Sequence, residues 1–154
     1  MPLFETLWRN HPSNKNPAIE KPCDNEQFDN QCCIRLGVAF ASSGIDMGSY
    51  SGDFCWNDHG RQHPLRVEQM LTWLTSDNAN FVEDPEVYVR GSGPARTFQN
   101  YMGRKGIVLF RNFWGRGNQG DHIDLWNGQR IAHGDNDYFE RSQELWFWKL
   151  KQGI

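Results

Sequence analysis

The sequence has few aliphatic side chains, no long apolar run and no excess of positive charge. No stretch approaches the roughly 18 to 20 consecutive apolar residues that a bilayer-spanning helix needs. Residues 1–12 lack a basic start followed by an apolar run. We therefore expect neither a membrane span nor a signal peptide. Lysine and arginine number 16 against 19 aspartates and glutamates, for a net charge of −3, so we do not expect nucleic acid as a partner.

Aromatic side chains are abundant instead. The 154 residues include 7 Trp, 4 Tyr and 10 Phe, while only 38% of the chain is apolar and 23% is charged. This composition is typical of a globular protein, and the length suits one domain rather than two. We therefore predict a single domain over residues 1–154, with a core built largely from aromatic rings.

The cysteine content permits two disulfides but does not require any. The four cysteines are Cys23, Cys32, Cys33 and Cys55. Because no signal peptide is expected, unpaired thiols are the default. A Cys23–Cys55 disulfide in an oxidising compartment stays open as an alternative.

A metal site is not expected. Cys55, His59 and His63 are spaced four apart, which on a helix would group three ligands. The intervening residues include asparagine, aspartate and glycine, which argue against a helix there, and no fourth ligand is evident. The sequence therefore predicts neither a metal nor a cofactor.

Helical patterns occupy the first two thirds of the chain. The clearest runs over 31–43, with Asp29 or Asn30 as its N-cap and Gly44 as its C-terminal stop. Shorter helices are predicted near residues 3–8, over 64–75 and, more weakly, over 94–102.

Strand patterns dominate the last third. They cover 107–110, 122–126, 129–133 and 145–150. Asn127-Gly128 between the second and third runs is a strong hairpin turn, and a turn centred there places His122 opposite His133. Helices followed by an antiparallel sheet predict an α+β fold in which N-terminal helices pack on the sheet.

One cysteine occupies a position suited to nucleophilic catalysis. Cys32 lies in the first turn of the helix predicted over 31–43, where unpaired backbone amides and the helix dipole favour a thiolate. A thiol nucleophile also needs an imidazole base and a third group that orients the imidazole. His122 is the candidate base. His133, the predicted cross-strand neighbour of His122, is the preferred orienting residue, and Asp135 is its rival.

Two motifs resemble a known family. Asn30-Gln31-Cys32-Cys33-Ile34-Arg35-Leu36 and the later Gly120-Asp121-His122-Ile123-Asp124-Leu125-Trp126-Asn127-Gly128 are similar to motifs in the fourth family of type VI secretion amidase effectors. The resemblance implies an NlpC-like, papain-related fold with Cys32 as nucleophile, Cys33 as an inert neighbour and His122 as base. The family usually carries an acidic residue at the position of His133, but NlpC-like enzymes more broadly can use a histidine there.

The resemblance also implies a function. It is hydrolysis of the amide between γ-D-glutamate and meso-diaminopimelate in peptidoglycan stem peptides, through a thioester on Cys32. The further implied partners are an immunity protein that blocks the cleft and the type VI secretion machinery. That machinery would carry the protein from the producing cytoplasm to the periplasm of a target bacterium.

Three more residues are candidates for substrate binding. Arg35 suits a substrate carboxylate, although an ion pair with a structural acid such as Asp124 explains it equally well. Asp124 and Trp126 share a strand face with His122, and a structural hydrogen bond is the alternative role for Asp124. The alternative functions are a non-catalytic cell-wall or carbohydrate-binding module, suggested by the tryptophans, and a transamidase or acyltransferase that uses the same residues.

Overall fold

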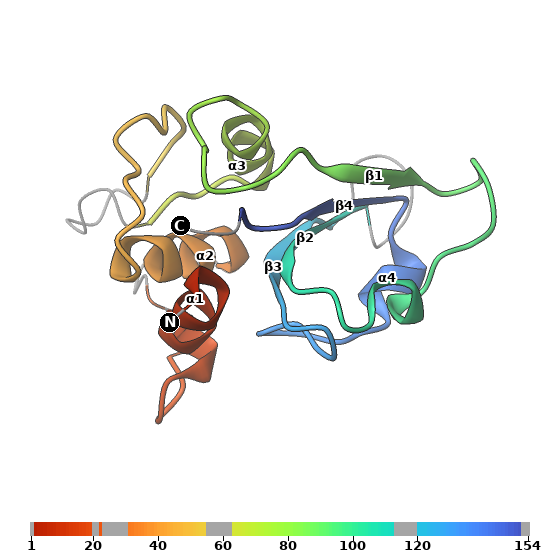
Figure 1. The fold of residues 1–154 in the computed structure, drawn as a ribbon, viewed down its shortest axis with the longest axis horizontal. Helices are drawn as coiled ribbons and strands as arrows, with labels where there is room; N and C mark the ends of the chain where they lie inside the picture. The colour runs from red at the N-terminus through yellow and green to blue at the C-terminus, as the bar shows by residue number, and fades with distance from the viewer. Residues whose placement is uncertain (1, 20–21, 23–30, 55–62, 113–119, 152–154) are drawn as a thin grey trace. The chain divides into compact units, whose positions relative to one another are not determined.

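The computed structural model describes residues 2–19, 22, 31–54, 63–112 and 120–151, and it divides into two compact units (Figure 1). The first unit lies within residues 1–80 and the second spans residues 81–151. Among the described residues, no helix combines the length and the apolar character that crossing a membrane requires. The single domain predicted over 1–154 stays a prediction.

The first unit is helical. Its elements are α1 (Leu3–Asn10), the 3₁₀ turn η1 (Pro12–Asn14), α2 (Cys32–Ser42) and α3 (Val67–Leu74). α1 and α3 both contact α2, and the core includes Leu7, Phe40 and Met70, which are fully buried. All three predicted α-helices of this part of the chain are therefore confirmed, although α3 begins three residues later than expected.

The ends of α2 follow partly from the residues around it. Gly44 follows the helix with a φ of +84°, a conformation that glycine adopts without steric cost. At the other end, Gln31 occupies the N-cap position and makes no side-chain capping bond. The N-cap expected at Asp29 or Asn30 is therefore wrong, and both of those residues lie outside the described part of the chain.

The second unit is built on an antiparallel sheet. Its strands are β1 (Glu86–Val89), β2 (Gly106–Arg111), β3 (His122–Trp126) and β4 (Glu144–Trp148), in the order β1-β4-β2-β3. Two short helical segments, η3 (Phe98–Tyr101) and α4 (Tyr138–Arg141), complete it. This arrangement confirms the α+β class. The helix expected over 94–102 is wrong except for the 3₁₀ turn η3, and β1 and α4 carry no clear sequence signal.

One face of this sheet carries an aromatic core. Phe139 of α4 packs its ring 4.8 Å from Phe110 of β2 and 4.9 Å from Trp126 of β3, measured between ring centroids. Tyr101 of η3 lies 5.1 Å from Phe139 on the same face. His122 and Asp124 lie on the same face as Trp126, because residues two apart on a strand point the same way. The aromatic core therefore lies next to these two polar residues on the sheet.

Candidate active site

Cys32 is the first residue of α2, as the sequence predicts. The side chain is a buried thiol that is not part of a disulfide in the described structure. The backbone hydrogen bonds of α2 begin at Arg35, whose N–H donates to the Gln31 oxygen at 2.8 Å. The amides ahead of it have no partner within the helix, and they place the positive end of the helix dipole at Cys32. Negative charge near this end of a helix interacts favourably with the dipole.

Cys33 occupies a different environment from Cys32. Successive residues of an α-helix are rotated by about 100°, so the two thiols point in different directions. The Cys33 Sγ lies 3.7 Å from the backbone oxygen of Arg66. Burial, and then the nearby Cys32, raise the pKa of the Cys33 thiol well above its usual value. Cys33 is therefore a neutral buried thiol.

Cys33 is expected to resist alkylation in the folded protein, because its raised pKa leaves less thiolate than a free cysteine has. In a Cys32→Ala variant at about pH 8, iodoacetamide should label Cys33 far more slowly in the native state than in urea. Peptide mapping by mass spectrometry measures both rates. Equal rates would contradict the burial of this thiol.

His122 begins β3 and is held by aromatic neighbours. Its ring stacks on that of Phe110 at 6.1 Å with an interplanar angle of 19°, and it meets the Tyr138 ring edge-on at 5.3 Å. Burial, and then Asp137, raise the pKa of Tyr138, so this phenol is neutral at neutral pH. The imidazole is thus positioned by two rings of the same unit.

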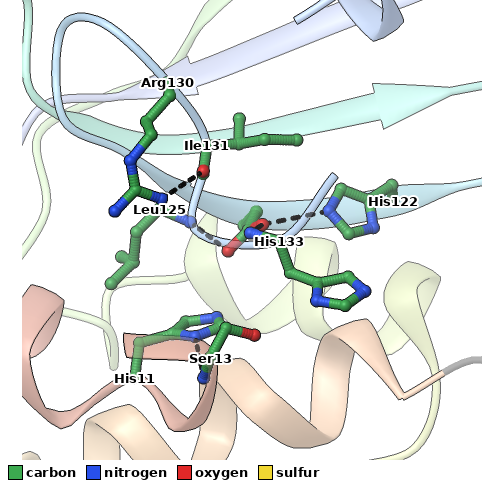
Figure 2. Close-up of polar contacts among 8 residues, drawn as sticks. His11, Ser13, His122, Leu125, Arg130, Ile131 and His133 are labelled. Carbon is green, nitrogen blue, oxygen red and sulfur yellow. Dashed lines mark hydrogen bonds and ion pairs between the residues drawn. The ribbon is translucent and has the colours of Figure 1, made fainter. Parts of the chain in front are cut away.

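His122 makes a buried polar contact with Asp124. His122 Nε2 lies 3.1 Å from Asp124 Oδ2, and both side chains are buried. A dashed line marks this contact at the His122 ring in Figure 2. The same carboxylate accepts the backbone N–H of Leu125 on Oδ1 at 2.8 Å and that of His133 on Oδ2 at 2.7 Å. Asp124 was expected as a substrate contact, and the His-x-Asp spacing was the available signal for this pairing, since residues two apart on a strand share a face.

The hairpin register differs from the predicted one. Trp126 pairs with Ile131 rather than with Gln129, and the Asn127 N–H donates to the Arg130 oxygen at 3.1 Å. The turn is therefore centred one residue later than expected, which shifts the pairing by two residues. The return segment forms only an isolated bridge, so the strand expected over 129–133 is also wrong.

The side chain of Asn127 explains the position of this turn. Its Oδ1 accepts the backbone N–H groups of Gln129 and Arg130 at 2.9 and 2.8 Å, which makes Asn127 the first residue of the turn. Gly128 then occupies the first central position, with a φ of +93°. The carbonyl of Gly128 also accepts the N–H of Gly103 at 2.9 Å. A contact remote in sequence thus supports the observed register.

The new register removes the basis on which His133 was preferred. His133 no longer lies opposite His122, and its backbone N–H approaches Asp124 instead. The rival Asp135 is exposed and follows Gly134, which has a φ of +131°. The His122 ring nitrogen Nε2 lies within hydrogen-bond distance of Asp124 Oδ2.

The remaining predicted residues occupy buried positions. Trp126 is fully buried, and its indole N–H donates to the backbone oxygen of Tyr101 at 2.8 Å. This corrects its expected role, because a ring without exposed surface offers nothing to a substrate. Arg35 is buried on α2, one turn after Cys32. Cys23, Cys55 and His59 lie outside the described residues, as does most of the glycine-rich segment before His122.

Comparison with known proteins gives a consistent result. The family model described as type VI secretion system, amidase effector protein 4, matches residues 28–148. The comparison with curated proteins gives no match.

Solved structures of effectors resemble the chain over nearly its whole length. The type VI effector–immunity complex Tae4–Tai4 from Salmonella Typhimurium matches with 17% identity and a TM-score of 0.68, covering 97% of this chain and 98% of that one. The type VI effector Tae4 from Enterobacter cloacae matches with 21% identity and a TM-score of 0.65, covering 98% of each chain. At these identities the structures establish a shared fold.

Proposed function

Because the chain belongs to the type VI secretion amidase effector family, amidase effector protein 4, we propose that it is a cysteine amidase that cuts peptidoglycan stem peptides in target bacteria. The observation that carries the proposal is the buried His122, which contacts a carboxylate, in a chain whose α2 begins with a buried cysteine thiol. A nucleophile of this kind and an oriented base are the two groups that thiol amidases need.

The proposed chemistry begins with attack by the Cys32 thiolate on the amide carbonyl carbon. The tetrahedral intermediate collapses to a thioester as His122 gives its proton to the leaving amine. Water, from which His122 removes a proton, then attacks the thioester carbonyl and restores the Cys32 thiol. Unpaired amides at the start of α2 are suited to stabilise the negative oxygen of each intermediate.

The proposed bond is the amide between γ-D-glutamate and meso-diaminopimelate. Support for this bond comes from the family motifs around Cys32 and His122. The guanidinium of Arg35, one turn after Cys32, is the proposed partner for a substrate carboxylate, since arginine binds carboxylates through paired donors. The chemistry requires no metal or cofactor.

The proposed setting is antibacterial competition. A type VI machine would deliver the protein to the periplasm of a target cell, where the stem peptides are accessible. By analogy with the solved effector–immunity complex from Salmonella Typhimurium, we propose that a cognate immunity protein binds this chain and protects the producing cell.

Digestion of purified peptidoglycan tests the function directly. Mass spectrometry of the soluble products should find new diaminopimelate amino groups and new γ-carboxyl groups of D-glutamate in equal amounts. The same digestion with a competing amine should still give the free acid. Amine adducts as the main product would indicate a transamidase, and glycan binding without any cleavage would indicate a binding module.

A further inference from the structure

We propose that Asp124 is the positioning residue for His122, and that residue 133 contributes its backbone N–H rather than its side chain. This inference rests on the proposed function, since it concerns the base of the same reaction. Asp124 would then orient the His122 imidazole, which is the role expected for an acidic residue at position 133.

The two nitrogens of the imidazole limit what His122 can do. Nε2 lies 3.1 Å from Asp124 Oδ2. Because a carboxylate can only accept, Nε2 carries the proton and Nδ1 is left as the acceptor in the neutral ring. Nδ1 is then the nitrogen that removes a thiol proton. With one nitrogen bonded to Asp124 and the other required by the nucleophile, neither remains for an orienting side chain at position 133.

The carboxylate is itself held in place by the backbone. Oδ1 accepts the Leu125 N–H at 2.8 Å and Oδ2 accepts the His133 N–H at 2.7 Å. Asp124 has 1% of its side chain exposed. Both oxygens therefore face N–H donors in a buried setting, where hydrogen bonds are strong and misplaced donors are costly. This geometry fixes the direction of the bond to His122.

Residue 133 holds Asp124 through its backbone N–H, a group that nearly every amino acid has. Proline is the exception, because it lacks a backbone N–H. The hairpin register brings this N–H to Asp124, since the Ala132 N–H already bonds to the Leu125 oxygen at 3.1 Å. A histidine at position 133 is therefore compatible with an intact, oriented base. The side chain there is free to differ from the acid usual in the family.

The first test compares Asp124→Asn with His133→Ala. An asparagine must turn its NH₂ group toward either the Leu125 N–H or the His133 N–H and His122, so at least one donor loses its acceptor. We expect Asp124→Asn to lower stem-peptide cleavage by about 10²- to 10⁴-fold. His133→Ala keeps its backbone N–H and should lose far less. The reverse order of the two losses would overturn the proposal.

The second test measures which ring nitrogen of His122 carries the proton. If Asp124 had a purely structural role, replacing it would not change this tautomer. Nitrogen-15 NMR, assigned with a His122→Gln variant, should find the neutral ring protonated on Nε2 in the parent and in His133→Ala. In Asp124→Asn the proton should move to Nδ1 or divide between the nitrogens. An unchanged tautomer in a folded Asp124→Asn variant would overturn the proposal. Asp124→Ala gives the same reading if the asparagine variant does not fold.

A third measurement separates this proposal from the proposed substrate. In a Cys33→Ala background, alkylation of Cys32 by iodoacetamide reports activation of the thiol without any peptide. Asp124→Asn should slow it strongly and His133→Ala should not. That result in a protein that cuts no peptidoglycan would sustain the role of Asp124 while the proposed function failed. Equal slowing by both variants would count against Asp124.

Discussion

Replacing Cys32 with alanine is expected to abolish release of stem-peptide fragments from purified cell wall. The variant lacks the atom that forms the thioester, so the rate should fall by about 10³-fold or more. Because the change is small and leaves the backbone hydrogen bonds of α2 in place, the free energy of unfolding should change by about 1 kcal/mol. Fragment release by mass spectrometry and circular dichroism measure the two effects.

Cys33→Ala is the matched control. It removes a thiol from the same turn of α2, but that thiol is buried beside the Arg66 oxygen and its pKa is raised. Its activity should remain near that of the parent. An active Cys32→Ala with an inactive Cys33→Ala would exchange the roles of the two cysteines.

Phe139→Ala is expected to have the largest effect on stability. Phe139 is fully buried, and its ring contacts those of Phe110, Trp126 and Tyr101 at 4.8 to 5.1 Å. Truncating such a ring leaves a cavity, so the free energy of unfolding should fall by about 3 to 5 kcal/mol. Because Phe110 also stacks on His122, loosening this core should lower activity as well. Urea unfolding followed by tryptophan fluorescence measures the loss.

Phe98→Ala provides the comparison for this core. Phe98 packs against the same cluster but is only partly buried. Less apolar surface is returned to water, and the cost should be about 1 to 2 kcal/mol. If both variants cost the same, burial in the aromatic cluster would not be what makes Phe139 important.

The location of the proposed nucleophile, Cys32, at the start of a helix could be predicted from local sequence. The apolar pattern after Gln31 and the glycine at position 44 mark a helix, and Cys32 lies in its first turn as expected, although the helix begins one residue later than predicted. The chemistry of a helix N-terminus depends on its own backbone, so no distant contact was needed to expect a reactive thiol there. The strand that begins at His122 follows equally from its alternating side chains.

The short elements of the second unit could not be predicted in this way. β1 has four residues and α4 has four, too few for a periodic pattern to distinguish them from a loop. β1 exists because it pairs with β4, and α4 places Phe139 on the aromatic core. Both are stabilised by partners distant in the sequence.

The sequence by itself determined that Cys32 lies at a helix start and His122 on a strand, because a helix start and an alternating strand are properties of neighbouring residues. Only the tertiary structure decided which group meets His122. That depended on a turn set by Asn127 and supported by the contact between Gly128 and Gly103. A shift of two residues in such a turn changes which side chains face each other across the hairpin. It brought the backbone of His133, rather than its imidazole, to the carboxylate that holds the base.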